Sequence, residues 1–197
     1  MDGKKLDELK AKYGASHGGE LFDPAFRKVA DKIFSKNGTR LAPYAGVPTF
    51  LSAPYMPVDA NEPDFGNLQV AITGVPMDLG VTNRPGSRFG PRAMRTIERI
   101  GPYNHVLDCA PVQYLRVADI GDVPFQSRYR LELSHEDIEK RFNQIVDAGV
   151  IPLAVGGDVV EVAPQYDATT NTAQAGAQVL FEILSLMVFS PSVARTA

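Results

Sequence analysis

The sequence contains no tryptophan and only one cysteine, Cys109. A single cysteine excludes a disulfide bond within the chain, so we expect a protein of a reducing compartment, most simply the cytoplasm. Nothing near Cys109 indicates a lowered thiol pKa, and we interpret it as a buried or bystander residue rather than a nucleophile.

Clustered positive charge and long apolar runs are also absent. The formal net charge is -3 with 22% charged residues, which argues against the clustered positive charge that nucleic acids or anionic membranes require. The longest apolar run, residues 179–189, is interrupted by Glu182 and is too short to span a bilayer. The first residues, MDGKKLDELKAKYG, lack the apolar core of a signal peptide, and we expect none.

Residues 1–67 read as an irregular, proline-rich N-terminal arm. Asp23 and Pro24 indicate the start of a short helix over residues 23–30. Beyond it, prolines favour extended backbone and aromatic side chains offer apolar area; these residues are Pro43, Tyr44, Pro48, Phe50, Pro54, Tyr55, Pro57 and Pro63. The arm either packs on its own chain or contacts another subunit.

Residues 68–197 have the pattern of an α/β domain. Apolar runs predict strands over residues 68–76, 114–121, 151–155 and 159–163. Helices are predicted from Pro91 to Gly101, from Ser134 to Gly149, and over about residues 171–189. For the middle helix Ser134 is the predicted cap and Asp137 the capping-box partner; its predicted apolar face is Ile138, Phe142, Ile145 and Val146. Strands alternating with helices indicate a parallel sheet covered on both faces.

The stretch IPLAVGGDVVEVAPQYD, residues 151–167, conflicts with that pattern. Only Gly156-Gly157-Asp158 separates its two strand-like runs, whereas parallel strands need a crossover of about a dozen residues or more. Either the two runs form a hairpin, or a segment between two distant strands is missing.

Acidic residues gather where the predicted strands end, the usual place for function in such sheets. They are Asp78, Asp119, Asp122, Asp158 and Glu161. Carboxylates at one edge suit a hard cation, but Asp is also common in such loops because it caps helices and turns. The three histidines, His17, His105 and His135, have no partner at ligand spacing and are interpreted as solvated or structural.

The loop over residues 74–92, GVPMDLGVTNRPGSRFGPR, is rich in glycine and arginine and is called the arginine loop below. Its glycines permit close backbone approach, and Pro91 starts a helix. Arg84, Arg88 and Arg92 either hold an anion or pair with carboxylates of the protein.

Four motifs occur in a fixed order: GVPxDxGxxxRPGxRxGPxxxR, ADIGDV, PLAVGGD and DVVEVAPQYDATTNTAQAG. Together they resemble the ureohydrolase family of agmatinases, guanidinobutyrases and arginases, over residues 68–197 and closest to the agmatinase and guanidinobutyrase branch. The arm is similar to that of bacterial agmatinase-like members. The resemblance implies an arginase-like parallel α/β sheet and hydrolysis of a guanidino compound to urea and an amine. It also implies two manganese ions that generate the attacking hydroxide.

The sequence departs from the family where the metal ligands should stand. Gly156-Gly157-Asp158 matches the start of the GGDHS motif, but Val159 replaces its histidine. The D-A-H-x-D and S-x-D-x-D-x-x-D-P motifs are absent, as is the proton-shuttle histidine. No catalytic or metal-binding residue therefore carries over. One substrate-binding residue, Glu161, does carry over. Glu161-Val162-Ala163-Pro164 matches the family's E-V-x-P strand end, whose Glu contacts the substrate guanidinium. Alternatively, Glu161 pairs with a local arginine.

These observations predict a partial arginase-like domain whose central strands are missing, with a deletion junction near residues 156–159. Three functions stay open: a guanidino hydrolase, an inactive interaction partner, and a small-molecule binder that uses Glu161 and the arginine loop. The partners would be a guanidino substrate, further copies of this chain in a homo-oligomer, or full-length relatives. Uncovered strand edges and helix faces predict association or poor solubility.

Overall fold

The structure is a computed structural model that describes residues 3–5, 7–8, 46–82, 84–97, 103–156, 162–166, 169 and 171–191. The chain divides into two compact units, residues 1–40 and 41–197. In the first unit the described residues are helical. The predicted helix over residues 23–30 and His17 lie outside the described residues.

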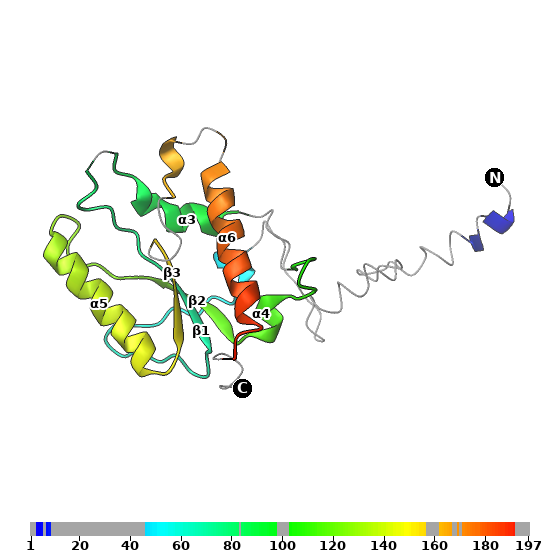
Figure 1. Ribbon diagram of the computed structural model, residues 1–197, viewed down its shortest axis with the longest axis horizontal. Coiled ribbons are helices and arrows are strands. Elements are labelled where there is room, and N and C mark those ends of the chain that lie inside the picture. Colours follow the sequence, from blue (N-terminus) through cyan, green and yellow to red (C-terminus); the bar gives the residue numbers. More distant parts are fainter. Residues whose placement is uncertain are drawn as a thin grey trace. The chain divides into compact units, whose positions relative to one another are not determined.

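The second unit is built on a parallel sheet (Figure 1). In the described part the sheet has three strands, β1 (Val70–Gly74), β2 (Val117–Asp122) and β3 (Ile151–Val155), in the order β2-β1-β3. Val70 of β1 is in register with Val117 on one side and Ile151 on the other. Every residue of β1 is buried, as expected for a central strand that reads as a continuous apolar run. The α/β class predicted from the sequence is confirmed.

Helices cover both faces of the sheet (Figure 1). One face carries α3 (Gly90–Arg95), α4 (Pro111–Tyr114) and α6 (Asn171–Met187), and the other carries α5 (Leu131–Asp147). Each face of the sheet has its own hydrophobic cluster, because successive side chains of a strand point to opposite faces. Val70 and Ile72 pack with α6, while Ala71 packs with α5. Leu180 and Leu184 of α6 are fully buried, and each contributes about 1.5–3 kcal/mol of transfer free energy. Within the described part, no helix combines the length and the apolar character that crossing a membrane requires.

The predicted start of α5 is wrong. The helix begins at Leu131, three residues before Ser134, and no side chain caps it. Ser134 lies in the first turn, where its hydroxyl donates to the carbonyl of Arg130 (3.1 Å). Asp137 accepts the backbone N–H (2.8 Å) and the side-chain amide (2.6 Å) of Gln126, so it anchors the preceding loop rather than a capping box.

Two further predictions need adjustment. Val146 was assigned to the apolar face of α5, but its side chain is 57% exposed, while Ile145 is fully buried. Residues 159–161 of the fourth predicted strand lie outside the described residues, and Val162 and Ala163 are not in a strand. They lead into a short 3-10 turn, η3 (Pro164–Tyr166).

The described part of the proline-rich arm packs on its own chain. Phe50, in the 3-10 turn η1 (Phe50–Ser52), is 1% exposed and belongs to the core beneath α6. Further on, Asp119 of β2 donates its N–H to Pro54, and Met56 donates to the carbonyl of Asp119, both at 2.9 Å. Residues 54–56 therefore run along the outer edge of β2, as the parallel bridge between Tyr55 and Asp119 also shows.

Val162 fixes the close packing of the two helices on one face of the sheet. A Cβ atom on Gly90, at the start of α3, would lie 2.6 Å from the Val162 carbonyl oxygen. A Cβ on Gly176, within α6, would lie 2.8 Å from Val162 Cγ2 and 3.0 Å from the sulfur of Met94. Only glycine fits at both positions without displacement. The segment that follows the predicted junction is thus held between α3 and α6.

Candidate functional site

The candidate site is the edge of the sheet where the three strands end, here called the carboxyl-end rim. It comprises the residues that close or follow β1, β2 and β3, together with Asp119 inside β2, which Arg95 links to Asp122 at the strand end. Of the acidic residues predicted there, the structure describes Asp78, Asp119 and Asp122. Asp158 and Glu161, the predicted substrate-binding residue, lie outside the described residues.

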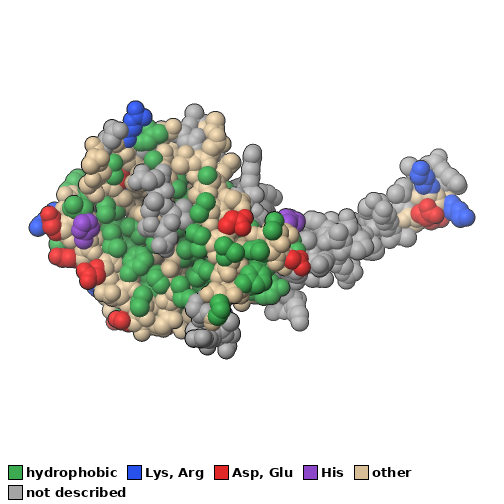
Figure 2. Space-filling view, in the orientation of Figure 1, with side chains coloured by type: hydrophobic (Ala, Val, Ile, Leu, Met, Phe, Trp, Pro, Cys, Tyr) green, Lys and Arg blue, Asp and Glu red, His purple; other side chains and the backbone are tan. Residues whose placement is uncertain are grey.

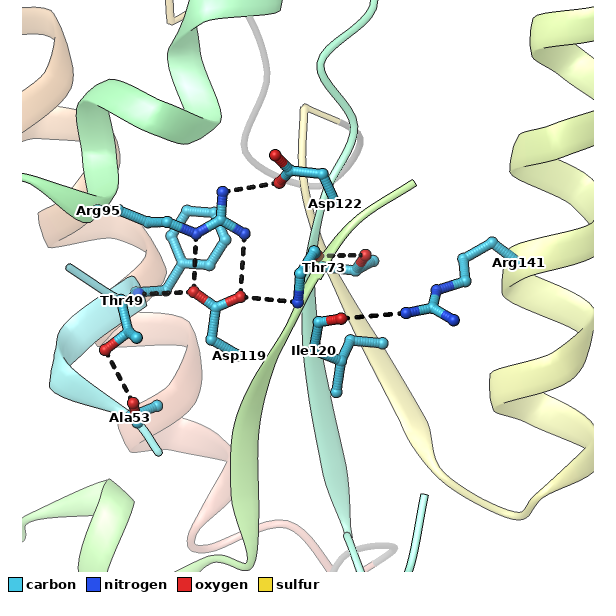
Figure 3. A network of polar contacts seen from close by, with 10 residues as sticks. Thr49, Ala53, Thr73, Arg95, Asp119, Ile120, Asp122 and Arg141 are labelled. Carbon is cyan, nitrogen blue, oxygen red and sulfur yellow. Dashed lines mark hydrogen bonds and ion pairs between the residues drawn. The ribbon is translucent and has the colours of Figure 1, made fainter. Parts of the chain in front are cut away.

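Asp119 is the most highly coordinated carboxylate of the rim (Figure 3). It is fully buried on β2. Its Oδ2 accepts hydrogen bonds from Arg95 Nε (2.7 Å) and the backbone N–H of Phe50 (3.1 Å). Its Oδ1 accepts from Arg95 Nη2 (2.9 Å) and the backbone N–H of Gly121 (3.0 Å). The side-on pairing with arginine is bidentate, the strongest geometry for such a pair.

Arg95 joins a second carboxylate to the same cluster. Its Nη1 donates to Asp122 Oδ1 (2.7 Å), and its guanidinium lies 4.0 Å from the centre of the Phe50 ring. Burial alone would lower the pKa of Arg95, but its hydrogen bonds and charge interactions with Asp119 and Asp122 outweigh burial and hold that pKa above its ordinary value. Arg95 therefore stays charged, and its positive charge offsets these two carboxylates.

A second ion pair closes the arginine loop. Asp78 is buried after β1, and its carboxylate accepts from Arg88 Nη2 (2.5 Å) and from the backbone N–H of Gly86 (2.6 Å). Burial would raise the pKa of Asp78, but the hydrogen bonds from Arg88 and Gly86 outweigh burial and place that pKa below 3.8. The sequence leaves two interpretations of Arg88: it holds an anion, or it pairs with a carboxylate of the protein. The structure shows the second.

The arginine loop also contacts the segment that follows Glu161. The guanidinium of Arg84 lies 5.5 Å from the centre of the Tyr166 ring, and the Tyr166 hydroxyl donates to the carbonyl of Pro85 (2.9 Å). Together with the packing of Val162 against Gly90, this brings two of the family-like motifs side by side although they are far apart in sequence.

A cleft of ≈510 Å³ opens beside this loop. Its walls are mainly apolar, and its charged members are the Asp78–Arg88 pair and Arg128. The lining residues include Met77, Phe89, Phe125 and Ser127 as well. The cleft can admit a small molecule, but the carboxylate in its wall is already engaged by Arg88.

The described rim does not fit the pair of metal ions that the sequence resemblance implies. Among the residues that the structure describes, no three histidine, cysteine, aspartate or glutamate side chains are placed to hold a metal. Asp78, Asp119 and Asp122 are each paired with an arginine, which competes with a cation for the same oxygens. His105 and His135 are exposed, and the His105 ring packs edge-on against Tyr103 at 4.8 Å.

The sequence predicts Asp119 at a strand end, whereas it is the third of the six residues of β2, and Arg95, its partner, was not singled out. Arg95 is the last residue of the GPxxxR motif, so a signal was present in the pattern. A buried arginine on α5, Arg141, was also missed. Its signal is its position three residues after Ile138 and four before Ile145, on the apolar face of the helix. Cys109 is buried, as predicted.

Comparison with known protein families identifies this architecture. Residues 68–158 and residues 155–185 match the profile described as Arginase family, and together these ranges cover more than half of the chain. The chain belongs to the arginase family.

Within that family the chain is similar to enzymes acting on guanidino compounds. It is 39% identical to guanidinopropionase of Pseudomonas aeruginosa over 126 residues, which are 64% of this chain and 37% of that enzyme. It is 37% identical to guanidinobutyrase of the same organism over 122 residues, 61% of this chain and 37% of that enzyme. The matched regions thus span little more than a third of these relatives' length.

A solved structure shows the same fold. The crystal structure of a hypothetical agmatinase from Burkholderia thailandensis superposes with a TM-score of 0.50 at 28% identity, over 57% of this chain and 34% of that chain. The shared part agrees with a partial arginase-like α/β domain.

The Asp119 cluster yields a first prediction. Asp119→Asn should lower the free energy of unfolding by about 3–5 kcal/mol, because it leaves part of a buried arginine–carboxylate pair uncompensated. Asp122→Asn is the matched control: that side chain is 39% exposed, and its loss should cost less than about 1 kcal/mol. Urea unfolding measures both, and equal costs would contradict a buried cluster centred on Asp119.

The Asp78–Arg88 pair yields a pH-dependent prediction. Because the pKa of Asp78 is lower in the folded chain than its ordinary 3.8, the pair contributes stability above pH 3.8, and the contribution is lost as pH falls through the folded-state pKa. The stability difference between wild type and Asp78→Asn should be largest near neutral pH and shrink in acid.

Glu139→Gln, which alters an exposed carboxylate on α5, is the control. Its effect on unfolding should stay small throughout the same titration. A difference for Asp78→Asn that does not change between neutral and acidic pH would count against the ion pair.

Proposed function

We propose that this chain is an agmatinase- or guanidinobutyrase-like member of the arginase family that has lost its dimanganese centre and does not hydrolyse guanidino compounds. The observation that carries this proposal is the sequence Gly156-Gly157-Asp158-Val159. Valine stands where the resembling family has its metal-binding histidine, and the two other ligand motifs are absent from the 197 residues.

The geometry of the rim supports this reading. Manganese of the family type needs several free carboxylates and histidines. In the described part, the rim instead offers carboxylates that are held by Arg88 and Arg95. We derive no hydrolytic step for this chain, because the donor set that would generate a metal-bound hydroxide does not fit.

An internal deletion accounts for the lost ligands. The two ranges that match the family profile, 68–158 and 155–185, overlap only in Val155-Gly156-Gly157-Asp158. We propose that an in-frame deletion joined two similar stretches of a longer ancestor and left one copy of this tetrapeptide. Sequencing the locus tests the idea, and an intact reading frame with no longer allele would refute it.

Glu161 keeps its proposed inherited role as the residue that contacts a guanidinium. A carboxylate suits this role because it accepts two parallel hydrogen bonds from the planar cation. The neighbouring Val162 is anchored against Gly90 and Gly176, which would hold the segment in place. Binding of a small molecule by Glu161 together with Arg88 is less well supported, because Arg88 is engaged by Asp78.

The second candidate function is a non-catalytic interaction or oligomerisation module in the cytoplasm. β3 pairs with β1 on one side, and in the described part no strand pairs with its other edge. Figure 2 shows hydrophobic side chains gathered on the side of the molecule in view, in the region between α5 and α6. Exposed apolar residues of these helices include Val146, Val179 and Leu186. The partners we propose are further copies of the chain or full-length relatives.

Activity is tested directly by urea release. Incubation with manganese and either agmatine or 4-guanidinobutyrate should give no urea above background, because the hydroxide-generating ligands are missing. Guanidinobutyrase of Pseudomonas aeruginosa, assayed alongside, is the positive control for the guanidinobutyrate arm. Metal analysis accompanies the assay: two tightly bound manganese ions per chain would overturn the proposal.

Association is tested by sedimentation velocity over a range of protein concentrations. The wild-type chain should form species larger than a monomer, because uncovered strand edges and apolar faces promote pairing. The variant Val179→Lys/Leu186→Lys, which changes two exposed positions of α6, should shift the distribution toward monomer. A wild-type chain that stays monomeric at every concentration would remove the support for the interaction module.

A further inference from the structure

Arg141 is a buried cation with unused hydrogen-bond donors. It lies on α5 with 2% of its surface exposed, and its Nη2 donates to the carbonyl of Ile120 on β2 (3.1 Å; Figure 3). Its Nε and Nη1 are buried and have no hydrogen-bond partner among the described residues. Buried polar groups of native proteins are almost always satisfied, so each exception calls for an explanation.

The surroundings compensate this charge only in part. The guanidinium lies 5.9 Å from the centre of the Phe65 ring, a weak cation–π contact at that distance. The acidic side chain that acts on it, Asp59, is occupied in a turn, where its Oδ1 accepts the backbone N–H groups of Asn61 (2.6 Å) and Glu62 (3.4 Å). Burial lowers the pKa of Arg141, and the charge of Asp59 opposes that shift.

A pocket of ≈430 Å³ adjoins Arg141. Its polar lining comprises Asn61, Gln126, Asp137, Lys140 and Gln144 in addition to Arg141, and Ala60, Pro124 and Phe125 complete the wall.

Within this lining the acceptors and the cations are not balanced. Both oxygens of Asp137 are taken by Gln126, which leaves Lys140 and Arg141 without an acidic partner among the ion pairs of the described residues. Gln144 donates its Nε2 to the carbonyl of Ala60 (2.8 Å), while its buried Oε1 has no hydrogen-bond partner in the described part. Arg141 therefore has no carboxylate hydrogen-bonded to it in the described part, although Asp137 lies in the same lining.

We propose that this pocket is a binding site for a small oxyanion, a carboxylate or a phosphate group. When the Arg141 guanidinium turns toward the pocket, the anion's oxygens accept hydrogen bonds from its unused nitrogens, and Lys140 adds positive charge at the exposed side. A planar guanidinium is well suited to such groups. A protonated oxygen of the anion, or a water bound with it, donates to Gln144 Oε1.

The site adjoins the cleft beside the arginine loop, since Phe125 lines both, but its polar groups are different ones. It is formed by the arm, by the loop after β2 and by α5, and it uses none of the residues assigned to the family's substrate or metals. Its existence does not depend on whether the chain hydrolyses guanidino compounds, so it stands or fails independently of the proposed function.

The test is thermal unfolding of the full chain titrated with sodium phosphate, with sodium acetate, and with sodium chloride at matched ionic strength. At tenfold the dissociation constant, the bound oxyanion should raise the unfolding midpoint by about 3–6 °C over chloride. The phosphate and acetate arms show which oxyanion the pocket prefers. If neither exceeds chloride, the proposal is wrong.

Variants assign the response to this pocket. Arg141→Met should weaken oxyanion binding about tenfold or more, and Lys140→Gln, an exposed change that spares the fold, should weaken it several-fold. Arg128→Gln, which removes an exposed arginine of the other cleft, should respond like wild type. An undiminished response in Arg141→Met and Lys140→Gln would overturn the assignment, and Lys140→Gln alone decides it if Arg141→Met does not fold.

Discussion

The buried carboxylate of Asp119 is the interaction on which the rest of the described fold depends. It receives two hydrogen bonds from Arg95 of α3, one from Phe50 of the arm and one from Gly121 at the end of its own strand. Three segments that are remote in sequence therefore meet at one side chain. An ionised group in a protein interior is tolerated only when its lone pairs are filled in this way. The cluster that orders the rim also occupies its carboxylate oxygens. Because arginine already binds these oxygens, few of them are free to bind a cation.

Membership of the arginase family is compatible with the proposed loss of its chemistry, because the two depend on different parts of the sequence. The family match spans β1 to β3 with the helices between them, and most of α6. Metal chemistry in the resembling family rests on histidine and aspartate residues at the ends of strands that this sequence does not contain. The apolar alternation that buries Ile72 against α6 and Ala71 against α5 is intact. Hydrophobic burial thus specifies the sheet independently of the polar residues that give a fold its reaction.

The sequence predicted the elements better than their ends or their polar contacts. The apolar runs of β1 and β3 and the helical period of α6 were legible because burial imposes them directly. The start of α5 was misplaced because Ser134 and Asp137 imitate a capping box, whereas the structure uses both to hold the loop before the helix. The pairing of Asp119 with Arg95 needed the tertiary fold, since the two residues are 24 positions apart. The position of Arg141 on the same helix face as Ile138 and Ile145 was a signal in the sequence that this arginine is buried. Glu161 and residues 157–159 of the predicted junction lie outside the described part, so their placement stays a prediction.

The position of Val162 between α3 and α6 explains how the chain can keep a packed core. It is the first described residue after the junction, and it fills the space that Gly90 and Gly176 leave open between α3 and α6. The polypeptide therefore re-enters the same core that it left at the end of β3. In terms of modularity, Val155 and Val162 belong to one hydrophobic cluster, so the chain leaves β3 and returns between α3 and α6 within seven residues. A chain connected in this way has the same core before and after the tetrapeptide Val155-Gly156-Gly157-Asp158.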